Sequence, residues 1–199
     1  MLDNAESRAR ISGLVDPVAR KLISFGVSPD AVTWAGAIGS VLTSAIFIAH
    51  GRFLLGALIL GVFSLSDLLD GTMARMQNRA GSWGAFLDST LDRVSDSAVI
   101  CALIVWFANS KSSLMVAVAS LALVTGFLTS YIRARAEAVG VECKVGFAER
   151  AERSLLIWMG MLLAGLGVPV LSATVCLLVI ASTITVAQRM MFVRKQLSL

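Results

Sequence analysis

Residues 53–69 read FLLGALILGVFSLSDLL, an apolar run with a single charged side chain that is long enough to cross a bilayer as a helix. Similar runs recur along the 199 residues, of which 57% are hydrophobic and only 15% charged. The mean hydropathy of +0.81 excludes a disordered chain and disfavours a soluble one. Three scattered cysteines, an odd number, exclude a disulfide scaffold. The sequence therefore predicts an all-α integral membrane protein.

Hydropathy divides the chain into six candidate transmembrane helices. They cover residues 32–49, 53–69, 84–109, 113–131, 155–170 and 171–188. An even number of spans places both termini on one side, and of the 17 Lys and Arg residues only Arg52 and Lys111 fall on the other. The positive-inside rule makes the termini cytoplasmic in the cell membrane. Because the opposite loops are too short to hold a site, we expect the active site to face the cytoplasm.

The chain is expected to form one domain, residues 1–199. Residues 1–30 lack the apolar stretch of a signal peptide and are predicted to form an N-terminal interfacial amphipathic helix. Residues 31–190 would be the six-helix bundle and residues 191–199 a cytoplasmic tail. A helix start is predicted within Ser28-Pro29-Asp30, since serine can cap the helix and proline suits its first position. The expected surroundings are membrane lipids, with no nucleic acid as a partner.

Four aspartates stand out in the second and third spans. Asp67 and Asp70 are spaced i,i+3, and Asp88 and Asp92 i,i+4, so each pair lines one helix face. Antiparallel packing of the two spans would bring both pairs to the cytoplasmic end. Each carboxylate within a membrane costs on the order of 2.5–3.5 kcal/mol, so cations must stabilise such a cluster. Oxygen ligands without histidine or cysteine favour Mg²⁺ or Mn²⁺.

Neighbouring arginines offer a simpler explanation for intramembrane carboxylates. Arg75, Arg79 and Arg93 could neutralise single aspartates, but two helically spaced pairs favour a metal site. Asp96 continues the face of Asp88 and Asp92 by one more turn. For Asp96 a functional role and simple neutralisation remain open.

The pattern Asp67-x-x-Asp70-Gly71-x-x-Ala74-Arg75, eight residues, then Gly84-x-x-x-Asp88-x-x-x-Asp92 resembles the signature of the CDP-alcohol phosphotransferases. These enzymes transfer a substituted phosphate from a CDP-linked donor to an alcohol and release CMP. The resemblance implies that Asp67, Asp70 and Asp88 hold a divalent metal, with Asp92 as a further ligand and as the general base. It also implies a set of residues that bind CDP-diacylglycerol: Pro29, Asp30, Ala31, Val32, Asp67, Gly71, Ala74, Arg75, Gly84, and Gly81 or Ser82.

Arginines gather in the second half of the chain at the ends of spans. A guanidinium group binds phosphate oxygens bidentately, which points to an acceptor that carries its own phosphate. SYIRARAEAVG, GFAERAER and the N-terminal PVARKLISFGVSPDAVT resemble segments of the actinobacterial phosphatidylinositol phosphate synthases. That resemblance implies inositol 3-phosphate as the acceptor, phosphatidylinositol phosphate and CMP as the products, and a homodimer. The implied acceptor-binding residues are Arg133, Arg135, Arg153 and Arg189.

Three other functions are weighed against this one. Glycerol 3-phosphate also carries a phosphate, so a phosphatidylglycerophosphate synthase is the nearest alternative. A membrane prenyltransferase also binds metal and pyrophosphate through aspartates, but it generally needs more helices and two separated acidic motifs. A cation carrier should line a path across the bilayer with carboxylates, whereas here they are confined to one leaflet.

Overall fold

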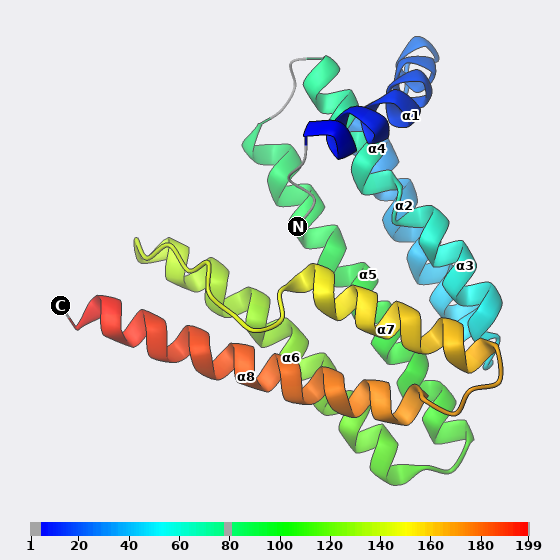
Figure 1. Ribbon diagram of the computed structural model, residues 1–199, viewed down its shortest axis with the longest axis vertical. Helices are drawn as coiled ribbons and strands as arrows, with labels where there is room; N and C mark the ends of the chain where they lie inside the picture. The colour runs from blue at the N-terminus through cyan, green and yellow to red at the C-terminus, as the bar shows by residue number, and fades with distance from the viewer. Residues whose placement is uncertain (1–4, 78–80, 199) are drawn as a thin grey trace. The chain divides into compact units, whose positions relative to one another are not determined.

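The computed structural model describes residues 5–77 and 81–198, with side chains from residue 15 onward, and these parts contain helices and no strand (Figure 1). The first half holds α1 (Ala5–Ser24), α2 (Pro29–Thr43), η1 (Ser44–Ile48), α3 (Phe53–Phe63) and α4 (Ser66–Met76). The second half holds α5 (Ser82–Asn109), α6 (Ser113–Ala138), α7 (Arg150–Gly165) and α8 (Leu171–Leu197). The predicted all-α class is therefore confirmed for the described residues.

Four helical segments of the described chain are long and apolar enough to cross a membrane. They are Pro29–Ile48, Phe53–Met76, Ser113–Ala138 and Leu171–Leu197. The other two predicted spans also fall on helices, but α5 carries several charged residues in its first half and α7 has only 16 residues. The all-helical membrane architecture thus agrees with the sequence, while the count of six spans stays a prediction.

One compact unit comprises the residues up to Leu42 together with Ile59–Ser95. Within it α1 packs on α4, and buried Ala37, Leu87 and Leu91 form a small core between α2 and α5. Glycine brings α2 close to the start of α4, because a Cβ added at Gly36 would overlap the side chain of Ser66. This packing places the polar ends of α2, α4 and α5 together.

The predicted span at residues 53–69 is interrupted in the structure. α3 ends at Phe63 and α4 begins at Ser66, whose hydroxyl donates to the carbonyl of Phe63 at 2.6 Å. A Cβ at Gly39 would overlap the ring of Phe63, so the interruption lies where α2 packs tightly against both sides of it. The hydrophobic pattern did not indicate this break because residues 53–69 carry a single charged side chain.

The second compact unit comprises Thr43–Leu58 and Asp96–Leu199. α8 packs on both α6 and α7; Figure 1 shows α6 and α8 side by side with the same direction, and α7 antiparallel to α8. Gly160 of α7 allows close packing on Thr174, which would clash with an added Cβ. The Trp158 indole donates to the Ala57 carbonyl at 2.7 Å, joining α7 to α3. These contacts hold α7 against α3 and α8.

Candidate functional site

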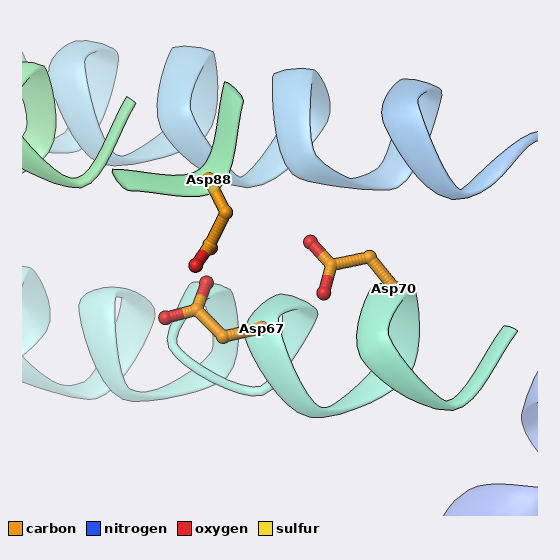
Figure 2. Close-up of side chains that lie close together, drawn as sticks. All are labelled: Asp67, Asp70 and Asp88. Carbon is orange, nitrogen blue, oxygen red and sulfur yellow. The ribbon is translucent and has the colours of Figure 1, made fainter. Parts of the chain in front are cut away.

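Three aspartates from two helices converge in the first unit. α4 supplies Asp67 and Asp70 one turn apart, and α5 supplies Asp88. One carboxylate oxygen from each residue lies within 4.8 Å of the other two, and Figure 2 shows the three side chains pointing toward one another. Asp70 is 8% exposed, while Asp67 is exposed and Asp88 lies between. Three carboxylates this close repel one another unless a cation is shared among them.

The chemistry of the donor set fits a hard divalent ion. All three groups are carboxylates, and no histidine or cysteine belongs to this cluster. Oxygen ligands of this kind suit Mg²⁺ and Mn²⁺ rather than zinc. The structure thus brings together three of the four aspartates that the sequence singled out.

Asp92 lies one turn beyond Asp88 on α5 but does not belong to the three-aspartate cluster. Its carboxylate is only 14% exposed and lies 3.8 Å from the guanidinium of Arg93. Asp96, a further turn along α5, pairs with Arg150 instead. The roles of Asp92 as ligand and base therefore stay predictions.

Thr33 of α2 holds the most buried of the three carboxylates. Its hydroxyl donates to Oδ2 of Asp70 at 2.6 Å, and the carbonyl of Pro29 lies farther away, at 3.2 Å. A hydroxyl has one proton, so the shorter, charge-assisted bond to the carboxylate is favoured. The sequence reasoning missed Thr33, although it follows Pro29 by one helical turn and directly follows Val32, two residues assigned to donor binding.

Replacing Thr33 by valine is expected to weaken Mn²⁺ binding by about 10- to 100-fold, as loss of a partner to a metal ligand does. Valine has nearly the same shape but leaves Asp70 without its donor, whereas Thr33→Ser keeps the hydroxyl. Titration of the purified protein with Mn²⁺, followed by electron paramagnetic resonance of the free ion, measures the affinity. Equal affinity in Thr33→Val and wild type would remove Thr33 from the site.

The start of α2 lies against the start of α5. The backbone N–H of Ala31 donates to the Ser28 hydroxyl at 3.2 Å, which confirms the predicted cap. The exposed Trp83 donates from its indole nitrogen to Asp30 at 3.0 Å. Two segments assigned to donor binding from the sequence, residues 29–32 and residues 81–84, are thereby joined. Trp83 itself was not predicted, because nothing in the local pattern marks its partner 53 residues away.

The two glycines of the signature in the first unit are not explained by helix packing. Among the described residues, a Cβ built on Gly84 would meet nothing within 4 Å, and one on Gly71 would meet only Nη1 of Arg75, at 3.5 Å. Arg75 is exposed and donates to the hydroxyl of Thr72 at 3.0 Å. Because both glycines border the aspartates, the space above them is available to a ligand.

Two of the four predicted acceptor arginines are buried in the second unit. Arg189 of α8 donates from Nε to the carbonyl of Val145 at 2.8 Å and from Nη1 to that of Thr129 at 2.5 Å. Arg153 of α7 donates to the carbonyl of Ala148 at 3.2 Å. Both guanidinium groups thus reach the segment at residues 145–148, which precedes α7.

The other two predicted arginines lie on α6. Arg133 forms an ion pair with Glu137 at 3.1 Å and is close enough to Arg189 for their charges to interact. Arg135 is exposed. The structure therefore brings Arg153 and Arg189 to one segment, with Arg133 near Arg189, and leaves Arg135 on the surface of α6.

Residues 26–193 match the family model described as CDP-alcohol phosphatidyltransferase. The chain belongs to this family. It is 41% identical to the phosphatidylinositol phosphate synthase of Cutibacterium acnes, over 94% of this chain and 96% of the relative. It is 40% identical to that of Mycobacterium tuberculosis H37Rv, over 92% and 87% respectively. Family membership and the apolar helices together make the chain a multi-pass membrane protein.

Solved structures of the Mycobacterium tuberculosis phosphatidylinositol phosphate synthase resemble this one closely. The crystal structure with CDP-DAG bound has a TM-score of 0.86 at 39% identity and covers 89% of this chain and 92% of that one. The structure in complex with manganese and citrate has a TM-score of 0.85, also at 39% identity, and covers 89% and 87%. The manganese in that relative and the three-aspartate cluster here both support the predicted Mg²⁺ or Mn²⁺ cofactor.

Proposed function

We propose that this protein transfers the phosphatidyl group of CDP-diacylglycerol to inositol 3-phosphate and releases CMP. The observation that carries the proposal is the convergence of Asp67, Asp70 and Asp88, at the spacing of a phosphotransferase signature, in a chain of that family. Phosphatidylinositol phosphate synthases about 40% identical over almost the whole chain support this choice of acceptor.

On the donor side, Asp67, Asp70 and Asp88 would hold the metal, which supplies positive charge to the pyrophosphate of the donor. Gly71, Ala74 and Gly84 are small and would let the phosphates lie beside the carboxylates, and Arg75 would offer them a guanidinium group. The first turn of α2, residues 29–32, would offer the CDP group the positive end of the helix dipole, and Gly81 or Ser82 would complete the CDP contacts.

Asp92 would be the general base of the transfer. It accepts the proton of the acceptor hydroxyl while the hydroxyl oxygen bonds to the phosphorus that carries diacylglycerol. The bond from that phosphorus to the CMP oxygen breaks in line, and CMP leaves with the electron pair. A carboxylate that is 14% exposed has little bulk water to compete for that proton.

On the acceptor side, Arg133, Arg135, Arg153 and Arg189 would bind the phosphate of inositol 3-phosphate. The buried Arg153 and Arg189 donate to backbone carbonyls, which carry only partial charge. Glu137 and Glu149 attract Arg189, while Arg133 repels it. A phosphate dianion would bring a full negative charge to these guanidinium groups and would accept from them bidentately.

The same proposal keeps the predicted membrane topology. α1 would lie at the interface, six helices would cross the bilayer as one domain within residues 31–190, and residues 191–199 would form a tail. Both termini and the active site would be cytoplasmic, as the distribution of Lys and Arg supports. Close relationship to the family favours a homodimer.

The proposal is tested with purified protein, CDP-diacylglycerol and Mn²⁺, with CMP release measured for three acceptors in parallel. Inositol 3-phosphate should react well, and free inositol and glycerol 3-phosphate poorly. A preference for glycerol 3-phosphate would instead make the protein a phosphatidylglycerophosphate synthase. Transfer from prenyl pyrophosphates, or metal flux into liposomes without CMP release, would reject the phosphotransferase role.

The open space at Gly84 allows a test of donor binding. Gly84→Ala should raise the apparent KM for CDP-diacylglycerol by about tenfold or more, because overpacking a fitted site costs about 1–3 kcal/mol. Gly126→Ala on α6 is the matched control, since a Cβ there also meets nothing within 4 Å. Steady-state CMP release measures both variants. Equal KM values in the two would show that Gly84 is not in contact with the donor.

A further inference from the structure

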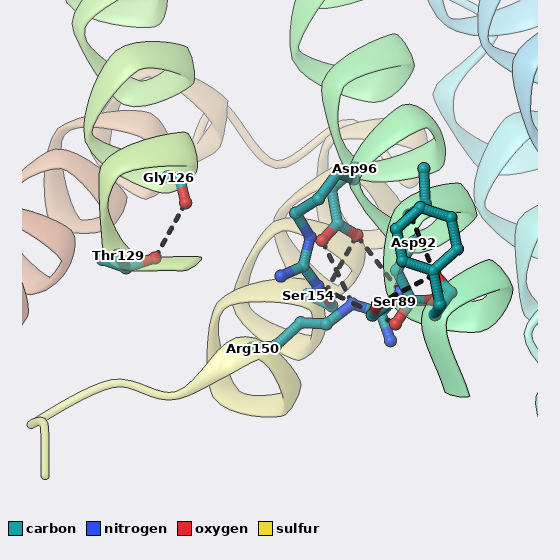
Figure 3. A network of polar contacts seen from close by, with 10 residues as sticks. Ser89, Asp92, Asp96, Gly126, Thr129, Arg150 and Ser154 are labelled. Carbon is teal, nitrogen blue, oxygen red and sulfur yellow. Dashed lines mark hydrogen bonds and ion pairs between the residues drawn. The ribbon is translucent and has the colours of Figure 1, made fainter. Parts of the chain in front are cut away.

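The carboxylate of Asp96 joins the first turn of α7 to α5. Asp96 accepts from Nε of Arg150 at 3.1 Å and from Nη2 at 3.5 Å, and from the hydroxyl of Ser154 at 3.5 Å. Figure 3 shows Arg150 and Ser154 both directed at Asp96. The Asp96 and Arg150 side chains are each 35% exposed, so the pair is partly shielded from water. A guanidinium held through two nitrogens has a fixed orientation.

This contact compensates for a weak helix start. Glu149 precedes α7 in an extended conformation and makes no side-chain cap. The N-terminus of a helix favours a negative charge, and Asp96 brings one there from another helix. The usual local signals for a stable helix start are therefore replaced by a long-range ion pair.

Arg153 lies within the turn that Asp96 holds. Arg150 and Ser154 come before and after it in sequence, and Nη1 of Arg153 donates to the Ala148 carbonyl directly ahead of the helix. Any rotation or fraying of this turn would move the Arg153 guanidinium. Asp96 itself does not belong to the three-aspartate cluster, and Arg150 and Ser154 already use both of its oxygens.

We propose that Asp96 is a positioning residue for the acceptor phosphate: through Arg150 and Ser154 it fixes the first turn of α7 and so the placement of Arg153. This rests on the proposed function, in which Arg153 binds that phosphate. It assigns to Asp96 a role in acceptor affinity and none in metal binding or proton transfer.

A double-mutant cycle on the wild-type chain tests the proposal. Asp96→Asn and Arg150→Gln should each raise the apparent KM for inositol 3-phosphate by about five- to tenfold. The KM of the double variant should not exceed that of the more affected single variant, because the two groups act as a pair. The KM for CDP-diacylglycerol and the Mn²⁺ requirement should stay within about twofold of wild type. Arg150→Lys keeps the charge but loses the bidentate guanidinium group. Its KM for inositol 3-phosphate should lie between those of wild type and Arg150→Gln.

Glu142→Gln is the matched control, because Glu142 pairs with Lys144 in an exposed ion pair on the segment before α7. Its kinetics should equal those of wild type. Hydrogen exchange supplies a readout that needs no substrate: the backbone amides of residues 150–154 should exchange faster in Asp96→Asn and not in Glu142→Gln.

Other outcomes overturn the inference. Additive effects in the cycle, equal rises in both KM values, a raised Mn²⁺ requirement or unchanged exchange would each exclude a positioning role through Arg150. If the wild-type enzyme ignores inositol 3-phosphate, the proposed function fails and the acceptor role of Asp96 fails with it. If wild type uses that acceptor and the variants show no acceptor-specific effect, only this inference is rejected.

Discussion

Asp88→Asn is expected to lower CMP release by about 10³-fold at saturating substrates, since a bound metal contributes several kcal/mol to charge stabilisation and each ~1.4 kcal/mol is tenfold in rate. Asparagine keeps the shape and one oxygen but removes the negative charge. Asp88 is the only α5 member of the three-aspartate cluster. Its loss leaves two carboxylates from one turn of α4, which cannot surround an ion from both helices.

Ser89→Ala is the matched control for this variant. Ser89 is the next residue on α5, is exposed, and donates to the Phe86 carbonyl of its own helix at 3.0 Å. The control should keep wild-type CMP release, and Mn²⁺ titration should show weaker binding in Asp88→Asn alone. Retention of more than a tenth of the activity in Asp88→Asn would exclude Asp88 as an essential ligand.

Asp92→Asn is expected to reduce kcat by about 10²- to 10⁴-fold, the range for loss of a general base. The amide cannot take the proton of the acceptor hydroxyl, but it leaves the three-aspartate cluster intact. The KM for CDP-diacylglycerol and the Mn²⁺ affinity should therefore stay close to wild type. Steady-state CMP release and Mn²⁺ titration on the same preparation separate these effects.

The behaviour of Asp92 also distinguishes its two predicted roles. A parallel fall of kcat and Mn²⁺ affinity in Asp92→Asn would make it a metal ligand rather than a base. Activity equal to wild type would remove it from the reaction. Arg93, its neighbour at 3.8 Å, offers a control through Arg93→Lys, which keeps the positive charge beside the carboxylate.

Local periodicity accounts for the parts of the structure that were predicted. The helical spacing of two aspartate pairs predicted that four carboxylates meet, because helix geometry is regular and consecutive helices pack antiparallel. The structure brings three of them together, Asp67, Asp70 and Asp88. The cap at Ser28 followed from the same local rules. Helix positions in the second half also agreed, since long apolar runs leave few other conformations in a membrane.

The unpredicted features depend on contacts between residues far apart in sequence. Thr33 and Asp70 are 37 residues apart, and Asp96 and Arg150 are 54 apart. Neither pairing has a spacing that marks it. The interruption between α3 and α4 likewise depends on how closely α2 approaches. Arg189 was expected to bind phosphate, and its bonds to the carbonyls of Thr129 and Val145 depend on how α6 and α8 pack.

The central claim is that α4 and α5 together hold a divalent cation through Asp67, Asp70 and Asp88. Its most direct test is the paramagnetic resonance of Mn²⁺ titrated into purified wild-type protein and into the variant with all three aspartates replaced by asparagine. The account predicts saturable Mn²⁺ binding by the wild type and none by the triple variant, with helical content unchanged in circular dichroism. Equal Mn²⁺ binding by the two proteins would contradict it.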